Sequence, residues 1–127
     1  MLLRLAGTIT ATAFLATLLP VEWMASTHRS LGLGEFPRAP IVDYLARSVA
    51  ALYGFHGVLL LLVSADPVKH RSIVSYIAFV NVLFGLMILA IDLHAGMPTA
   101  WTLGEGPPIV AFGIVVGLLN RRLAPAF

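Results

Sequence analysis

The sequence predicts an all-α fold: an integral membrane four-helix bundle with two structured outer loops, formed by one domain that covers residues 1–127. Two observations lead to this class. Hydrophobic residues make up 59% of the chain and charged residues only 11%, whereas a soluble domain carries about 25% charged residues. The mean hydropathy is +0.94, and the few charges lie between long apolar runs, which indicates that lipid is the solvent.

Charge and cysteine content narrow the classes of partner and chemistry. The net charge is +2, but the basic residues lie in short clusters beside apolar segments, which is typical of a membrane protein rather than a nucleic-acid-binding one. We therefore expect membrane lipid as a partner and no nucleic acid. The chain contains no cysteine, which excludes disulfides, thiolate metal sites and cysteine catalysis.

An uncleaved first span is expected over about residues 4–24. A cleaved signal peptide is the alternative, because the basic Arg4 precedes an apolar core. The run is long for a signal peptide, and it ends in Pro20-Val21-Glu22-Trp23 rather than in a small-residue cleavage site. Trp23 would then lie among the lipid headgroups, where interfacial aromatic residues are common.

The second span is expected over about residues 40–64, because proline is tolerated in the first turn of a helix and Pro40 precedes an apolar segment. Two polar residues, Tyr53 and His56, interrupt the apolar core three positions apart. Small residues form an adjacent face on which another helix can approach closely: Ala46, Ala50, Gly54 and Gly57.

The third span is expected over about residues 67–95. Asp66 would act as its N-cap and Pro67 as its first residue, so that the helix opens directly after the second span. Gly96 would end it. Small and polar residues recur at helical spacing and should face a neighbouring helix: Ala78, Asn81, Gly85, Ile88 and Asp92.

The fourth and shortest span is expected over about residues 107–123, after Gly106-Pro107-Pro108, with its two terminal arginines snorkelling to the interface. Gly113 and Gly117 have a Gly-x-x-x-Gly spacing, which allows close contact either within the bundle or between two copies of the chain. We therefore consider a homo-oligomer or a larger membrane complex as partners.

The charge distribution predicts the orientation. With four spans, both termini and the turn around residues 66–71 share one side, which holds five basic residues and one acid. The other side holds three basic residues and five acids. Because cytoplasmic segments are enriched in Lys and Arg, both termini are expected in the cytoplasm, with the chain in a bacterial inner (plasma) membrane.

The outer side is where a site is expected. The two outer loops, residues 24–39 and 96–106, are rich in Gly, Pro and aromatic residues, which favours a compact cap over the helix ends. Arg47 lies about two turns inside the second span, where an unpaired guanidinium costs about 2.5–3.5 kcal/mol, so it should face acids. The candidate ligand-binding cluster consists of Glu22, Asp43, Arg47, Asp92, Trp101 and Glu105. The alternative, a structural ion-pair network, is the commoner use of such residues.

A second group of polar residues lies nearer the bilayer centre. Tyr53, His56 and Asn81 could line a proton or substrate path towards Asp92. Hydrogen bonds between helices are the commoner explanation of such residues.

No catalytic residue, metal ion or cofactor is expected. No helix carries the His-x-x-x-His or Glu-x-x-His spacing of a metal site. The chain also contains no phosphate loop, nucleophile elbow or dinucleotide-binding fingerprint.

Several stretches resemble small bacterial four-span membrane proteins of uncharacterised function, and the layout is similar to that of DoxX-like proteins. The stretches are Leu19-Pro20-Val21-Glu22-Trp23-Met24, Leu31-Gly32-Leu33-Gly34-Glu35-Phe36-Pro37, Tyr44-Leu45-Ala46-Arg47-Ser48, Ile91-Asp92-Leu93 and Trp101-Thr102-Leu103-Gly104-Glu105-Gly106-Pro107. The resemblance implies the four-span fold and carries no activity or catalytic residue with it.

Three functions follow from this reading. The first is a non-enzymatic accessory subunit or small-ligand-binding protein, organised around Arg47. The second is a small oligomeric transporter or proton-coupled carrier. The third is an enzyme acting on a lipid or quinone, with Glu22, Asp92 or Glu105 as its acid or base. The absence of a catalytic motif in the sequence favours the first.

Overall fold

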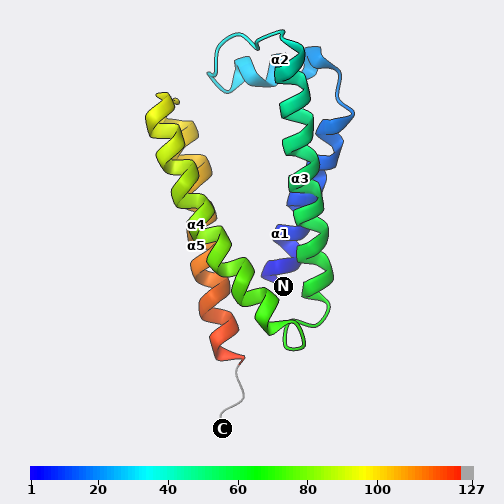
Figure 1. Cartoon of the computed structure of the whole chain (residues 1–127), viewed down its shortest axis with the longest axis vertical. Helices are drawn as coiled ribbons and strands as arrows, with labels where there is room; N and C mark the ends of the chain where they lie inside the picture. The colour runs from blue at the N-terminus through cyan, green and yellow to red at the C-terminus, as the bar shows by residue number, and fades with distance from the viewer. Residues whose placement is uncertain (124–127) are drawn as a thin grey trace. The chain divides into compact units, whose positions relative to one another are not determined.

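The computed structural model describes residues 1–123, and all regular structure in that range is helical (Figure 1). The elements are α1 (Leu2–Ala11), the 3-10 helix η1 (Thr12–Thr17), α2 (Val21–Ser30), α3 (Pro40–Ser64), α4 (Arg71–Ala95) and α5 (Thr99–Arg122). Three of them, α3, α4 and α5, are long and apolar enough to cross a membrane, while Leu2–Thr17 is a shorter apolar helix. The all-α prediction is confirmed.

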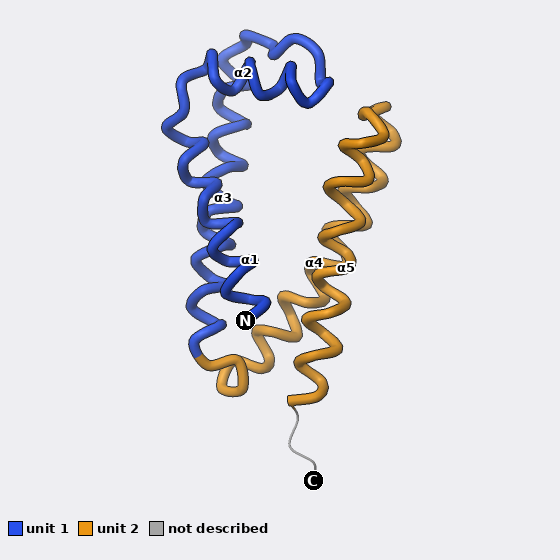
Figure 2. The backbone as a smooth tube through the Cα atoms, turned by 180° about the vertical axis from the view of Figure 1, so that it is seen from behind, with its two compact units in different colours: residues 1–65 blue, residues 66–127 orange. Residues whose placement is uncertain are grey.

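The chain divides into two compact units, Met1–Ala65 and Asp66–Phe127 (Figure 2). In unit 1, α1 and η1 pack against α3; in unit 2, α4 packs against α5. The assembly of both units into one four-helix bundle stays a prediction. The last four residues of the predicted domain, 124–127, lie outside the described residues.

The prediction of one continuous helix over residues 4–24 is wrong. The α-helix ends at Ala11 and continues as a 3-10 helix to Thr17; a new helix begins at Val21. Proline has no N–H and disfavours helical geometry in the residue before it, so the first helix cannot continue through Pro20. Pro20 itself is extended and precedes the first turn of α2.

Threonine hydroxyls accompany the change from α to 3-10 geometry. Thr10, Thr12 and Thr17 each donate a hydrogen bond to a backbone carbonyl three or four residues earlier. Such bonds compete with the regular ladder and bend helices. The threonines are visible in the sequence, but a prediction based on the length of the apolar run takes no account of them.

Unit 1 is held together by close contact at glycines. A Cβ added to Gly57 would overlap the backbone of Ala11, and one added to Gly7 would lie 2.9 Å from the carbonyl oxygen of Gly57. Gly54 accommodates the ring of Phe14, whose edge packs on Phe55 at a centroid distance of 5.0 Å. The predicted small-residue face of α3 is therefore a helix-packing face, since van der Waals contact at small residues is the main attraction between membrane helices.

The connection into α4 differs from the prediction. The carboxylate of Asp66 does cap a turn, accepting a hydrogen bond from the backbone N–H of Lys69 at 3.0 Å. That turn ends at His70, whose ψ of 26° is not helical, so α4 begins at Arg71 rather than at residue 67. At the other end, Gly96 terminates α4 as predicted, in the left-handed conformation that glycine adopts without strain.

Helix α5 begins two turns before the predicted start. Residues 99–106, expected in an outer loop, form its first turns, and Pro107 and Pro108 lie inside the helix. The predicted second structured loop is therefore wrong: residues 96–98 alone connect α4 to α5. Neighbouring groups in a membrane protein can satisfy the carbonyls that proline leaves free, which is why proline is tolerated in such helices.

Unit 2 also packs through glycine. A Cβ added to Gly85 would lie 2.8 Å from the carbonyl oxygen of Gly106, and one added to Gly113 would lie 2.7 Å from that of Ala78. Gly113 therefore serves the α4–α5 contact within one chain. Gly117 has only an ordinary 3.5 Å contact with Ala78, so the Gly-x-x-x-Gly pair is used at one of its two positions.

Candidate functional site

The break between η1 and α2 leaves backbone carbonyls without helical partners. The last carbonyls of any helix need hydrogen-bond donors from elsewhere, and Pro20 cannot supply an N–H. Arg47, on α3 beside the break, fills this need. Its side chain is 30% exposed, so its partners are only partly screened by solvent.

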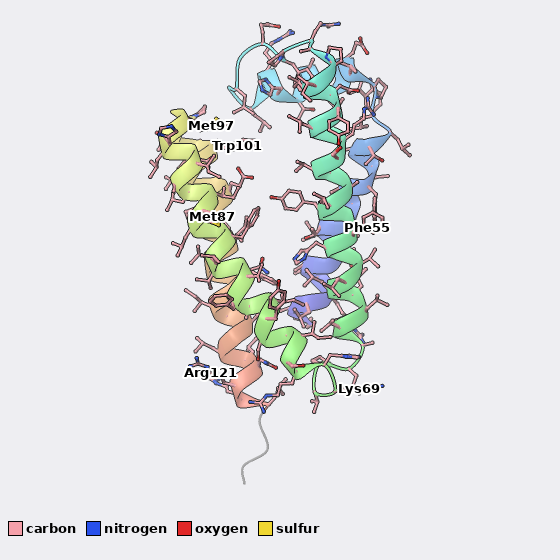
Figure 3. All side chains as sticks on the ribbon, viewed as in Figure 1. Phe55, Lys69, Met87, Met97, Trp101 and Arg121 are labelled. Carbon is pink, nitrogen blue, oxygen red and sulfur yellow. The ribbon has the colours of Figure 1, made fainter. Side chains whose placement is uncertain are left out.

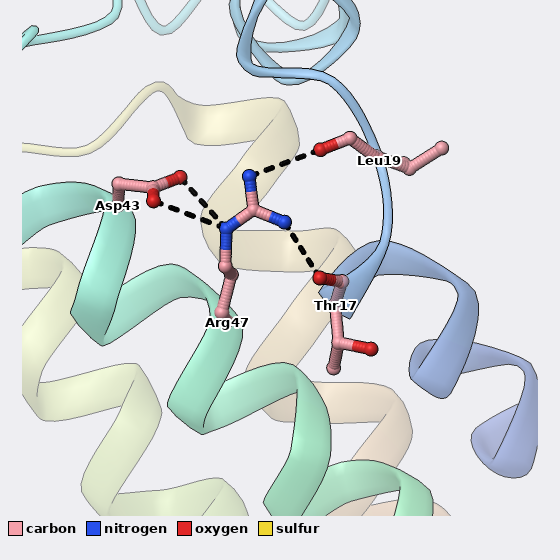
Figure 4. A network of polar contacts seen from close by, with 4 residues as sticks. All are labelled: Thr17, Leu19, Asp43 and Arg47. Carbon is pink, nitrogen blue, oxygen red and sulfur yellow. Dashed lines mark hydrogen bonds and ion pairs between the residues drawn. The ribbon is translucent and has the colours of Figure 1, made fainter.

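All three nitrogens of the Arg47 guanidinium donate hydrogen bonds within unit 1 (Figure 4). Nη1 donates to the carbonyl oxygen of Thr17 at 2.6 Å and Nη2 to that of Leu19 at 3.0 Å. Nε donates to both oxygens of Asp43, at 2.9 and 3.1 Å. We call this network, formed by Arg47, Asp43, Thr17 and Leu19, the arginine clamp.

The arginine clamp orients each of its parts. Asp43 lies one turn before Arg47 on the same helix, a spacing at which side chains meet, and it fixes the Nε edge of the fork. The planar guanidinium then aims its other two nitrogens at the two carbonyls, as its rigid geometry allows. The result is that α3 is joined to the end of η1 by charge-assisted hydrogen bonds.

Glu22 pairs with Arg38 instead of Arg47. The ion pair measures 3.8 Å and both side chains are largely exposed, so it contributes little to stability. The candidate cluster draws on both units: Asp43 and Arg47 meet in unit 1, whereas Asp92, Trp101 and Glu105 lie in unit 2, and the meeting of all of them stays a prediction.

The predicted first outer loop, residues 24–39, is partly wrong, because residues 24–30 belong to α2. The segment after that helix folds back on it. Nδ1 of His28 lies 3.0 Å from the carbonyl oxygen of Gly34, and its ring packs edge-on against Phe36. Arg29 pairs with Glu35 at 3.2 Å. Gly32 and Gly34 have positive φ angles, which glycine alone adopts readily, and this lets the loop turn tightly.

In unit 2, the predicted residues gather where α4 and α5 approach their connection. Asp92 is only 5% exposed and its Oδ2 accepts no hydrogen bond from any described residue. Glu105 lies near enough for its charge to interact with that of Asp92, and its carboxyl group hydrogen-bonds with Trp101, one turn earlier on α5. Figure 3 labels Trp101 near the amino end of α5.

The intramembrane candidates lie in both units: Tyr53 and His56 in unit 1, and Asn81 in unit 2. The Asn81 amide donates to the carbonyl oxygen of Ile77 on its own helix, at 2.8 Å, rather than across a helix interface. Tyr53 and His56 are half-buried on α3 in unit 1. Their use in a proton or substrate path stays a prediction.

Asn120 is a buried polar residue that the sequence reading missed. It is 4% exposed, and its amide donates to the carbonyl oxygen of Arg71 at 3.0 Å and to Oγ of Ser75 at 2.8 Å. These bonds join the end of α5 to the start of α4. In the sequence Asn120 stands directly before Arg121 and Arg122, a pattern that is typical of a helix end exposed to water.

Within residues 1–123, no three His, Asp or Glu side chains lie close enough together to hold a metal ion. The similarity to DoxX-like proteins rests on chain length and span count and stays a prediction. Comparison of the chain with protein-family models, with curated proteins and with solved structures found no match.

Proposed function

We propose that this chain is a four-span protein of the bacterial inner (plasma) membrane that acts as a non-enzymatic accessory subunit of a larger membrane complex. The observation that carries the proposal is the arginine clamp. Arg47 is the residue best suited to hold an anionic ligand, yet all three of its guanidinium nitrogens serve Asp43 and the backbone of unit 1. This use supports a role in building the protein rather than in binding a substrate.

The length of the first apolar helix supports the fourth span. The 10 residues of α1 rise about 15 Å and the six of η1 about 12 Å, together roughly 27 Å. The hydrocarbon core of a bilayer is about 30 Å thick. The 3-10 winding lengthens the segment, and exposed Trp23 just beyond it is suited to the headgroup layer.

A face of α4 supports assembly with a partner. Exposed residues recur along it at alternating spacings of three and four, the pattern by which helices interlock. We call this face the α4 row; it consists of Tyr76, Phe79, Leu83, Leu86, Ala90 and Leu93. Lipid tails are the alternative neighbour of this row, and the experiment below separates the two.

The test is native purification of the tagged full chain in mild detergent, followed by sizing and mass spectrometry. We expect a complex larger than the chain alone, with one recurrent integral membrane protein in it. Replacing Phe79 and Leu86 together by Ala should release that protein. A matched pair on exposed α5 positions, Ile114 and Leu118 replaced by Ala, should not. Recovery of the chain as a lone monomer, or equal loss from both variants, would contradict the proposal.

A further inference from the structure

The α4–α5 end of unit 2 contains a buried carboxylate oxygen without a partner. Asp92 is 5% exposed, and Oδ2 accepts no hydrogen bond from the described residues. The amino end of α5 is close in the chain, but none of its N–H groups bonds Oδ2; the third and fourth, of Trp101 and Thr102, donate to the carbonyl oxygen of Pro98. A buried charged group in this condition requires compensation from a donor or an opposite charge.

The register of the two helices brings a second buried polar side chain opposite Asp92. An added Cβ on Gly106 would lie 3.1 Å from the backbone nitrogen of Leu89. Asp92 lies one turn after Leu89 on α4, and Thr102 lies one turn before Gly106 on α5. Because side chains three or four residues apart share a helix face, Asp92 and Thr102 also lie opposite each other, one turn nearer the connection. Thr102 is also 5% exposed.

The surroundings of Asp92 are acidic and aromatic. Glu105 is near enough to interact with it through charge, and Trp101 hydrogen-bonds with Glu105. The hydroxyl of Thr102 donates to the Pro98 carbonyl at 3.4 Å, which leaves its oxygen able to accept. The nearest basic side chain along α4 is His94, which is exposed two positions on and therefore on a different face.

The cations of unit 2 lie at its opposite end. Asn120 bonds the carbonyl oxygen of Arg71, so the start of α4 and the end of α5, with Arg121 and Arg122, are together there. Helix α4 is 25 residues long, which separates its ends by roughly 37 Å. No arginine or lysine of this unit can therefore neutralise Asp92 and Glu105.

We propose that the α4–α5 end binds a monovalent cation, an alkali metal ion or a small protonated amine, between Asp92, Thr102 and Glu105. Oδ2 of Asp92 supplies the buried acceptor, Glu105 the second negative charge, and Thr102 a neutral oxygen. The indole of Trp101 adds an aromatic surface of the kind that attracts ammonium groups. A monovalent ion fits this set better than Ca²⁺, which takes six to eight oxygen ligands.

The two tryptophans of the chain allow a direct measurement. A Trp23→Phe background leaves Trp101 as the single reporter beside the site. The purified full chain is titrated in detergent with sodium chloride or methylammonium chloride up to roughly 100 mM, a range that covers millimolar affinities. N-methylglucamine chloride keeps the ionic strength constant and serves as the bulky-cation control. Thermal unfolding is followed in the same solutions, because a ligand of the folded state raises the melting temperature.

We expect a saturable change in Trp101 fluorescence and a rise in melting temperature with sodium or methylammonium but not with N-methylglucamine. A response to sodium alone would identify the ligand as an alkali metal ion, and a response to methylammonium alone would identify it as a small protonated amine. Asp92→Asn should weaken binding about tenfold or more, the equivalent of one charge–charge interaction, and Glu105→Gln should weaken it less. Asp66→Asn, at the exposed start of unit 2, should leave it unchanged.

Two results would overturn the proposal. One is an equal response of the background protein and the folded Asp92→Asn variant. The other is flat fluorescence and an unchanged melting temperature with both ions in the protein that carries Asp92, a measurement that depends on no substitution at the site.

Discussion

In unit 1 the helices approach at Gly7, Gly54 and Gly57, and in unit 2 they approach at Gly85, Gly106 and Gly113. In both units the helices thus approach closely at residues without a side chain. Such packing is expected in lipid, where no hydrophobic driving force brings apolar side chains together. The difference lies in their polar groups. Unit 1 places the half-buried guanidinium of Arg47 against backbone carbonyls, whereas unit 2 leaves buried oxygens of Asp92 and Asn120 without partners among the described residues.

The polar groups of the two units therefore differ in whether they have partners. In the arginine clamp each of the three guanidinium nitrogens already donates to Asp43 or to the backbone of unit 1, so the clamp stabilises a break in the chain. A buried oxygen without a partner lowers stability, and at Asp92 the cation proposed above would supply that partner. Four sets of substitutions, taken in order of expected effect, test the comparison.

The largest effect is expected at the glycine contacts. Gly57→Val in unit 1 and Gly106→Val in unit 2 should each destabilise the protein by about 3 kcal/mol, because the added atoms overlap backbone that cannot move aside. Denaturation in mixed micelles, followed by circular dichroism, measures the change. Gly104→Ala is the control: no atom lies within 4 Å of the added Cβ, so stability should stay the same or rise slightly. A small effect at Gly57 or Gly106 would show that the contacts are looser than described.

The next effect is expected at the arginine clamp. Arg47→Met would leave the carbonyls of Thr17 and Leu19 and the carboxylate of Asp43 unpaired, at about 2 kcal/mol after allowance for partial solvent exposure. Arg47→Lys should recover only part of this, because one ammonium cannot reproduce the planar fork. The same denaturation assay applies, with the exposed Arg38→Met as a variant expected to behave like the parent. Full recovery by lysine would mean that charge alone matters here.

A smaller effect is expected from Asn120. Asn120→Leu removes the two hydrogen bonds to Arg71 and Ser75 and should cost about 1 kcal/mol, within the range measured for polar contacts between membrane helices. Asn81→Leu should cost less, since Asn81 bonds only to a carbonyl of its own helix. Equal values for the two, measured by unfolding in detergent, would remove the distinction between a bond within a helix and one between helices.

The smallest effect is expected at the loop after α2. Glu35→Gln removes an ion pair with Arg29 in which both side chains are mostly exposed, so the stability should change by less than about 0.5 kcal/mol. The loop would instead lose order if its main support, the packing of His28 on Phe36, were removed by Phe36→Ala. Limited proteolysis between residues 31 and 39 distinguishes the two variants.

Element types were predictable from the sequence, and so was one pair of boundaries. The second predicted span, 40–64, coincides with α3, because Pro40 marks its start and an apolar run follows. The small-residue faces were also recognisable from spacing. The break at residues 18–20 was missed because apolar residues occupy it, although Pro20 and three threonines mark it. The start of α5 was missed because glycine and proline there read as a loop.

The candidate site was predictable in its residues more than in its contacts. Arg47 and Asp43 at a spacing of four were identified correctly as a pair. The other partners of Arg47 are backbone carbonyls, which every residue has, so only the position of the helix break selects Thr17 and Leu19. The expected meeting of Asp92 with Arg47 stays a prediction. The burial of Asp92 in unit 2 could not be predicted from sequence spacing alone.

The fourth span can be tested most directly by the side on which the N-terminus lies. The chain has no cysteine, so single cysteines at Leu2, Thr27 and Lys69 can be labelled in spheroplasts with a membrane-impermeant maleimide. If α1 and η1 cross the bilayer, Thr27→Cys reacts in intact spheroplasts, while Leu2→Cys and Lys69→Cys react only after permeabilisation. Labelling of both Leu2→Cys and Thr27→Cys before permeabilisation would contradict the account, because the N-terminus would then lie outside and α1 with η1 would not span the membrane.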